Sequence, residues 1–276
     1  MVTGCATGPL AKSPERLALA DITVMRELMA DYSGTLAKVA ALGYTTFGFR
    51  LYGYAGPSLA EPAPRLKAAM VRAAGLEIGA TRLSVRNADY DRELDIAAEM
   101  GSRIAVITTA PPFIAGPELF KTTRAAFEAW LPQLAKVGKK ARDRGLRLAY
   151  HNHPYDFLPL DGEQPFDLMA NSISPELLSF ELDLAWLWLA GIDPLQMLRR
   201  LGPRVVTMHW KDVDRRRGTE RTDQAVAPGL GEMGYAALLP AVRRLTTATG
   251  YIEVDKPEDG ITAARFGAEL VKRVLA

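Results

Sequence analysis

The chain lacks residues on which several classes of protein depend. It has one cysteine, Cys5, in 276 residues, which excludes an internal disulfide framework and a cysteine-rich metal cluster. It has no apolar run of about 20 residues, the length that a transmembrane helix needs, and the run LAWLWLAG at 184–191 is too short. The net charge is only +2, with basic and acidic residues mixed along the chain, so nothing favours nucleic acid as a partner.

The first residues carry a pattern of their own. VTGC at 2–5 resembles the end of a bacterial lipoprotein signal, but no charged region or apolar region precedes it. As the chain stands, we expect a cytoplasmic protein with a flexible N-terminal tail over residues 1–18. If the true start lies upstream, Cys5 becomes a lipid-bearing first residue, the remnant of a lipoprotein signal, and the protein is periplasmic. The alternative is a disordered tail with a free thiol.

Short apolar runs alternate with longer amphipathic segments through the rest of the chain. We expect strands at 19–24, 46–51, 77–85, 103–109, 146–152, 178–183, 204–209 and 251–255. We expect helices at 33–43, 61–75, 91–101, 121–145, 234–250 and 260–276, several of which end at glycine.

About eight strand–helix repeats predict a single-domain (β/α)₈ TIM barrel over residues 19–276. An open doubly wound sheet is the alternative, but no G-x-G-x-x-G motif follows the first strand. The interior of the chain has no linker rich in proline, glycine or serine that would divide it.

Polar side chains gather at the carboxyl ends of the last four strands. Side chains alternate between the two faces of a strand, and active sites of such barrels lie at the carboxyl ends of the strands. Burying several ionisable groups together is costly unless a cation compensates them, and a mixed nitrogen and oxygen set suits Mn²⁺, Mg²⁺, Co²⁺ or Fe²⁺. The alternative is a hydrogen-bonded polar plug without metal. The ionisable residues on the shared face are His151, His153, Glu181, Asp183, His209, Glu253 and Asp255.

Several short motifs, in order, resemble the sugar phosphate isomerase/epimerase family of the xylose isomerase-like TIM barrels. AYHNHPYDF (149–157) resembles YHNHDFEF, and ELDLAWLWLAGIDP (181–194) resembles ELDxxWxxxAGxDP. MHWKD (208–212) resembles xHxKD, and YIEVD (251–255) matches the last strand. RELMADYSGTLAKVAALGY (26–44) resembles the opening helix of the family. The resemblance runs from about residue 19 to the end of the chain.

The resemblance implies one divalent metal ion held by four side chains, with His151 and His153 lining the substrate pocket instead of binding metal. The implied ligands are Asp156, Asp183, His209 and Glu253. Alternation of faces alone points to His151 and His153 where the family pattern points to Asp156.

Four positions depart from the family pattern. Asp156 stands where glutamate is usual, which shortens the reach by ~1.5 Å. Gly48 stands where the second strand often ends in glutamate, and Arg82 where the third strand usually ends in histidine. Trp186 stands where sugar epimerases often carry histidine. These departures weigh against ordinary 3-epimerase chemistry but keep the type of metal ligand.

The resemblance also implies roles in catalysis. Glu253 is the expected base that removes a proton next to a substrate carbonyl, giving an enediolate, and Asp156 the partner acid. His151 or His153 would shuttle a hydroxyl proton or hold the substrate. Lys211 and Arg82 would bind hydroxyls, a carboxylate or a phosphate, and Trp186, Trp188 and Trp210 either stack on a sugar or pack in the core. The expected substrate contacts are His153, Lys211, Arg82, Trp186, Trp210 and Asp212.

Three functions stay open. The first is a metal-dependent sugar isomerase or epimerase. The second is a metal-dependent lyase that cleaves a keto-glycoside or dehydrates an inosose by β-elimination. The third is a non-catalytic sugar-binding barrel. The expected partner is a small-molecule carbohydrate, and a homo-oligomer is compatible with the sequence. A related DNA-repair endonuclease family is disfavoured, because its metal cluster needs many more than three histidines.

Overall fold

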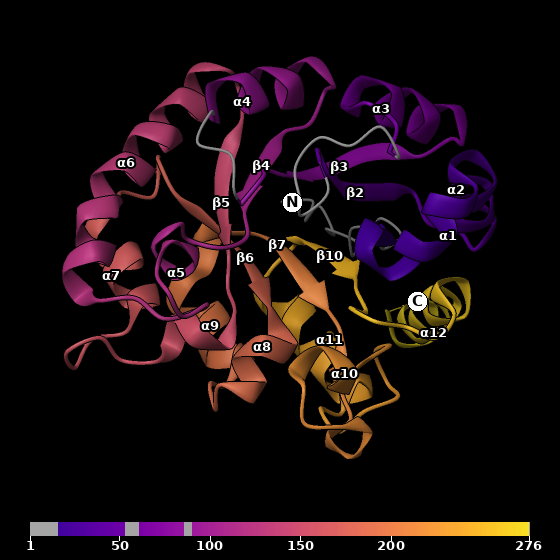
Figure 1. Ribbon diagram of the computed structural model, residues 1–276. Helices are drawn as coiled ribbons and strands as arrows, with labels where there is room; N and C mark the ends of the chain where they lie inside the picture. The colour runs from indigo at the N-terminus through magenta and orange to yellow at the C-terminus, as the bar shows by residue number, and fades with distance from the viewer. Residues whose placement is uncertain (1–15, 53–60, 86–89, 276) are drawn as a thin grey trace, which may run out of the picture.

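Eight parallel strands close into a barrel surrounded by helices (Figure 1). The computed structural model describes residues 16–52, 61–85 and 90–275. The strands follow one another around the barrel in chain order, and the last pairs with the first. The predicted TIM barrel is therefore confirmed. The strands are β1 (Ala18–Ala20), β2 (Thr46–Arg50), β3 (Glu77–Arg82), β4 (Ile104–Ile107), β5 (Arg147–His151), β6 (Ser179–Asp183), β7 (Val205–Trp210) and β10 (Thr249–Ile252).

The helices cover the outside of the barrel and the ends of its strands (Figure 1). The longer helices are α2 (Tyr32–Ala41), α3 (Pro64–Ala73), α4 (Tyr90–Glu99), α6 (Arg124–Asp143), α7 (Pro165–Ser172), α9 (Pro194–Leu201), α11 (Tyr235–Leu245) and α12 (Gly260–Leu275). Shorter ones are α1 (Met25–Ala30), α5 (Pro112–Ala115), α8 (Leu184–Leu189) and α10 (Arg221–Gln224). Short 3₁₀ turns lie at η1 (Asp21–Val24) and η2 (Pro154–Phe157), and a small antiparallel pair joins β8 (Asp212–Val213) to β9 (Ala225–Val226).

The structure corrects three details of the predicted elements. The expected first strand at 19–24 is shorter, because a 3₁₀ turn begins at Asp21. The expected opening helix at 26–44 is broken at Asp31, whose carboxylate accepts a hydrogen bond from Gly34 N and caps α2. The last strand ends at Ile252, so Glu253 lies just beyond it. The expected N-terminal tail, with Cys5, falls mostly outside the described residues.

None of the helices in the described segments is both long enough and apolar enough to cross a membrane. The apolar run at 184–191 forms α8, a six-residue helix. Its first four residues, Leu184, Ala185, Trp186 and Leu187, are buried in the protein.

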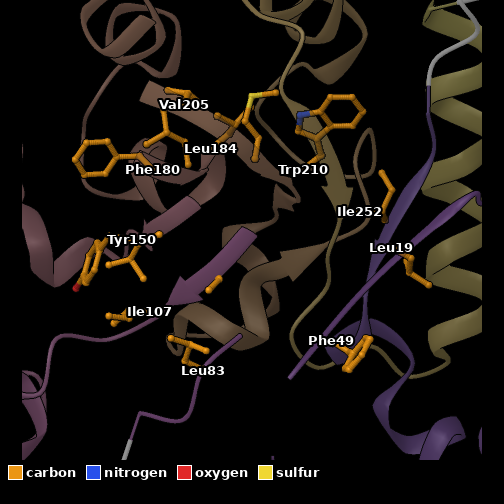
Figure 2. Close-up of a cluster of buried hydrophobic side chains, with 14 of the residues drawn as sticks. Leu19, Phe49, Leu83, Ile107, Tyr150, Phe180, Leu184, Val205, Trp210 and Ile252 are labelled. Carbon is orange, nitrogen blue, oxygen red and sulfur yellow. The ribbon is translucent and has the colours of Figure 1, made fainter. Parts of the chain in front are cut away.

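The main hydrophobic core lies between the strands and the helices. Figure 2 shows part of this layer, including Leu19, Phe49, Trp210 and Ile252, which come from different strands. α12 approaches the barrel closely, because a side chain at Gly267 would contact Ile252. The outward faces of the strands therefore bind the helices, which leaves the inward faces for a second, smaller set of side chains.

The barrel interior is narrow and is filled mainly by small residues and one tyrosine. The inner cluster comprises Ala18, Ala20, Ala80, Val106, Ala149 and Tyr251. The Tyr251 ring lies where side chains at Gly48 and Gly79 would otherwise project, and a Cβ at Gly48 would come within 2.9 Å of it. The pairing of β2 with β3 shifts register at this point, and Ala80 N donates a hydrogen bond to the Tyr251 hydroxyl at 2.8 Å. Tyr251 thus occupies the space that a side chain at position 48 would need.

On the outer face, the Trp210 indole lies across Gly250 of the neighbouring strand. A Cβ at Gly250 would overlap the indole ring. The guanidinium of Arg243 lies over the same ring, 4.6 Å from its centroid. The tryptophan is fully buried, so it has little room to move aside.

We expect Gly250→Ala to lower the free energy of unfolding by about 1–3 kcal/mol, because the added methyl group overpacks this contact. Chemical denaturation measures the change. Gly116→Ala is the matched control, since a Cβ there would meet its nearest atom only at 3.8 Å. Equal stability of the two variants would contradict the tight Trp210–Gly250 contact.

Candidate active site at the carboxyl ends of the strands

Buried ionisable side chains converge at the carboxyl ends of the strands, where β3, β5, β6, β7 and β10 finish. They come from five strands and the residues that follow them, and each is at most about 5% exposed. The cluster comprises Arg82, His151, Glu181, Asp183, His209, Lys211 and Glu253.

Several of these side chains turn their polar atoms toward a common point. The Nδ1 atom of His209 lies 2.5 Å from Oε2 of Glu253 and 3.7 Å from Oδ2 of Asp183. The Nε2 atom of His151 lies 3.9 Å from the same Asp183 oxygen. Suitable ligand atoms of His151, Asp183 and His209 all fall within 4.8 Å of one another. The arrangement brings imidazole nitrogens and carboxylate oxygens within reach of one ion.

The two oxygens of Asp183 serve different purposes. Oδ1 accepts hydrogen bonds from Ala185 N and Trp186 N, both at 3.0 Å, and so caps α8. Oδ2 lies 2.9 Å from Nζ of Lys211 but has no hydrogen-bond partner with good geometry among the described residues. The cap fixes the carboxylate in place while its second oxygen stays available at the centre of the cluster.

Carboxylates outnumber fixed cations in the cluster. Arg82 and Lys211 are buried among Glu181, Asp183, Glu253 and Asp255. The nitrogen and oxygen donors among these carboxylates suit a divalent cation chemically, and such a cation would compensate part of their charge. Nδ1 of His209 and Oδ2 of Asp183, both buried and without a well-formed hydrogen bond among the described residues, are the atoms that an ion would satisfy. The residues present therefore fit a divalent metal.

The charges shift the titration of their neighbours strongly. Burial disfavours the charged form of His209, but Glu253 and Glu181 beside it raise the pKa of its imidazole to about 10. Burial would raise the pKa of Glu253, yet His209 and Lys211 hold that pKa well below its usual value. Glu253 is therefore ionised at neutral pH, as a base that removes a proton must be.

Asp156 lies apart from this cluster in the structure. It is fully buried in the η2 turn, where Oδ1 accepts a hydrogen bond from the Tyr150 hydroxyl at 2.8 Å. Its Oδ2 accepts one from His153 N at 2.6 Å. Both oxygens are thus engaged, and the atoms that gather around Asp183 and His209 are those of His151 and Glu253. Burial raises the pKa of Asp156 to about 7.

A cavity of about 640 Å³ opens above the cluster. His153 lies on its wall, with its ring stacked on Tyr155 at 5.0 Å between centroids and on Trp186 at 6.3 Å. Phe120 stacks on the same tyrosine at 4.9 Å. Burial lowers the pKa of His153, so its imidazole is neutral at neutral pH. The aromatic wall can pack against a ring, and the imidazole can exchange hydrogen bonds with hydroxyl groups.

Three of the expected substrate contacts, Lys211, Trp210 and Asp212, do not line the cavity among the described residues. Trp210 packs in the outer hydrophobic core. The carboxylate of Asp212 accepts hydrogen bonds from Val213 N, Gly229 N, Gly231 N and Met233 N, and so it anchors the loop that follows β9. Trp188 lies beside the guanidinium of Arg215, 4.9 Å from the ring centroid. Alternation of faces already separates Trp210 from His209, which is its neighbour in sequence.

The structure brings in residues to which the sequence motifs assigned no role. Glu181 lies 3.1 Å from Nε2 of His209 and 3.2 Å from Arg82, at the centre of the charge network. The sequence did contain a sign of this, because Glu181 lies on the same face of its strand as Asp183. The segment 110–120, which contains Phe120, was expected to shape the pocket, but the sequence did not single out Phe120 or Tyr155, because both lie beyond the strands, where no alternation of faces applies. At the rim, Asp21 accepts a hydrogen bond from Arg50 N at 2.9 Å.

Comparisons with known proteins agree with this architecture. A family model described as xylose isomerase-like TIM barrel matches residues 36–273. A solved structure of a sugar phosphate isomerase/epimerase from Parabacteroides distasonis ATCC 8503 superimposes with a TM-score of 0.78 at 18% identity, covering 95% of each chain. The IOLI protein, solved with a zinc atom, superimposes with a TM-score of 0.68 at 13% identity, covering 94% of this chain and 96% of the other.

A curated relative is similar over a shorter stretch. Inosose dehydratase 2 of Bacillus cereus is 28% identical over 131 residues. The match covers 45% of this chain and 43% of the relative, so the chain spans less than half the length of that protein.

The burial of Asp156 makes stability depend on pH. Because its pKa is raised to about 7 in the folded protein, Asp156 keeps a proton between about pH 4 and 7 that the unfolded chain releases. That contribution to stability is full at low pH and is lost as the pH rises through 7. We expect the free energy of unfolding of the EDTA-treated protein, measured relative to Asp156→Asn, to fall by roughly 2–3 kcal/mol from pH 5 to pH 8. A difference that stays constant over this range, measured by urea titration, would show that Asp156 is already ionised when folded.

Proposed function

Because the chain belongs to the xylose isomerase-like TIM barrel family, we propose that it is a divalent-metal-dependent sugar isomerase or epimerase. The observation that supports this most directly is that ligand atoms of His151, Asp183 and His209 lie within 4.8 Å of one another. Oε2 of Glu253 lies 2.5 Å from Nδ1 of His209, beside this group. The proposed substrate is a sugar or cyclitol with a carbonyl next to a hydroxyl. The aromatic wall of the cavity supports a ring-shaped substrate.

We propose that Asp183, His209 and Glu253 hold the ion, with His151 or Asp156 as a fourth ligand. When bound, a divalent cation would withdraw charge from the substrate carbonyl and acidify the neighbouring C–H. The family pattern favours Asp156, whereas the short distance between His151 and Asp183 favours His151. The metal could be Mn²⁺, Mg²⁺, Co²⁺ or Fe²⁺.

In this proposal Glu253 removes the proton next to the carbonyl, because its carboxylate is ionised and borders the cavity. Lys211 donates a hydrogen bond to Oε1 of Glu253 at 2.7 Å, which orients the base. His151 and His153, neutral and next to each other with ring centroids 4.8 Å apart, move or hold a hydroxyl proton. Asp156, with a pKa of about 7, is the candidate acid that returns a proton to the substrate. It is hydrogen-bonded to the Tyr150 hydroxyl and to His153 N, so the proton would be relayed by one of these two residues.

The second candidate is a lyase. Trp186 stands where sugar epimerases of the family often carry histidine, and its indole lies over Nζ of Lys211 at 4.2 Å. An indole supplies no group for reprotonating the opposite face of an enediolate, so loss of a β-leaving group becomes the competing outcome. The relative named inosose dehydratase 2 supports the same interpretation. A non-catalytic barrel is the third candidate.

We expect Asp183→Asn to weaken Mn²⁺ binding by more than about 100-fold, measured by isothermal titration calorimetry. The asparagine keeps the oxygen that caps α8 and removes the charge of the free oxygen, so the fold should persist. Asp193→Asn is the matched control, because Asp193 caps α9 in the same way but does not line the cavity. A wild-type protein that binds no divalent ion would remove both enzyme hypotheses. His151→Gln and Asp156→Asn compared in the same titration identify the fourth ligand.

The reaction is tested by incubation with ketoses and 3-keto-glycosides with Mn²⁺ in D₂O. Deuterium in an isomeric sugar product indicates isomerisation or epimerisation, and release of water or an aglycone indicates elimination. We expect Glu253→Gln to reduce exchange at least about 100-fold, since it loses the base. Glu220→Gln, at the cavity rim, should keep the wild-type rate. Near-normal exchange by the Glu253 variant would assign the proton transfer to another residue.

A further inference from the structure

One cation at the cavity floor has a donor group that no protein atom satisfies among the described residues. Arg82 is 5% exposed and lines the cavity, and its Nη1 atom has no hydrogen-bond partner in that part of the chain. Its Nη2 atom is used: it lies 3.2 Å from Glu181, 3.8 Å from Glu253 and in contact with the His209 ring. The guanidinium is therefore held in position on one side and left open on the other.

A buried N–H group without an acceptor costs about 1–3 kcal/mol, so such a group is unusual unless a ligand completes it. The missing partner must be an oxygen acceptor that enters the cavity. A guanidinium is always charged, and its N–H group makes a shorter and stronger hydrogen bond to a carboxylate oxygen than to a neutral oxygen. Arg82 thus offers more than a neutral hydroxyl group needs.

The other buried cation of the cluster is not available for this purpose. Lys211 donates hydrogen bonds to Glu253 at 2.7 Å and Asp255 at 2.8 Å, and it lies 2.9 Å from Asp183. Its three donors therefore face three carboxylates. The difference between Lys211, which is saturated, and Arg82, which is open, singles out Arg82 as the anchor for an anion.

The surroundings of Arg82 favour a single negative charge. Glu181 and Glu253 lie within 3.8 Å of the guanidinium, and Asp255 also lines the cavity. These carboxylates would repel a dianionic phosphate more strongly than a monoanionic carboxylate. One unpaired nitrogen is also a poor match for the three oxygens of a phosphate group.

We propose that Arg82 binds a carboxylate on the substrate, so that the protein acts on a sugar acid or a carboxylated cyclitol instead of a neutral sugar. The inference rests on the proposed function for the reacting end of the substrate, but it concerns a separate contact. In this proposal Arg82, which stands where the family usually has histidine, determines which class of substrate binds.

The test compares ligands that differ only in the group at C6. D-glucuronate, D-galacturonate and D-mannuronate are each titrated into the protein beside the matching hexose and hexose 6-phosphate, with Mn²⁺ and again with EDTA. We expect at least one uronate to bind about 10-fold or more tightly than both its hexose and its phosphate. A protein that binds no uronate more tightly than its hexose, or that binds a phosphate more tightly, overturns the proposal.

Variants assign the preference to the residue. Arg82→Gln should reduce the uronate-to-hexose ratio to within about threefold, and Arg82→Lys should restore part of it. Arg221→Gln is the matched control, because it removes the same charge from the exposed rim of the same cavity. A ratio unchanged in Arg82→Gln overturns the assignment. If the glutamine variant does not fold, as judged by circular dichroism, the lysine variant and the wild-type ligand series still decide.

The outcomes separate this inference from the proposed function. Deuterium exchange on neutral sugars, with no preference for uronates, would contradict the role of Arg82 and leave the enzyme hypothesis intact. A uronate preference that depends on Arg82, in a protein that binds no divalent ion, would support the carboxylate contact and remove metal-dependent catalysis.

Discussion

The site depends on one constraint: several carboxylates are buried within a few ångströms of one another at the mouth of a narrow barrel. Without compensation, such a cluster would either take up protons or open to water. The protein holds it with Arg82, Lys211 and a His209 imidazole that the neighbouring carboxylates keep protonated. A divalent ion would take over the part of this compensation that His209 supplies, since a ligand nitrogen must be free of its proton. In the proposed site, a proton and the metal would therefore compete for the imidazole of His209.

The alternation of side chains along strands made most of the site predictable. The apolar face of each strand packs against the helices, so the opposite face must point into the barrel. His151, Asp183 and His209 lie on that inner face and could be predicted from the sequence alone. Glu253 followed in the same way, although it lies one residue beyond its strand. The same logic places Trp210 outside, because it is adjacent to His209 in sequence. The fold was predictable for the same reason, since repeated strand–helix units have few ways to bury two apolar faces.

Residues beyond the strand ends were harder to place. Asp156 lies in a 3₁₀ turn, where no period of two applies, and its direction is set by Tyr150 and by the backbone of His153. The family motif gives the position of Asp156 in the sequence, but it does not predict the hydrogen bonds that set the direction of its side chain. The break at Asp31 is similar, because a capping hydrogen bond of local origin divides a stretch that reads as one helix.

The departures at Gly48 and Arg82 are physically connected. At Gly48 the pairing of β2 with β3 shifts register, and Tyr251 fills the space that a side chain there would occupy. The Tyr251 hydroxyl then accepts the hydrogen bond from Ala80 N, which fixes β3 two residues before Arg82. Since residues two apart share a face, the same contact that excludes a glutamate at position 48 directs Arg82 toward the cavity. The two departures therefore belong to one rearrangement of the barrel mouth. In it, Tyr251 packs inside the barrel and the Arg82 side chain lies at the bottom of the cavity.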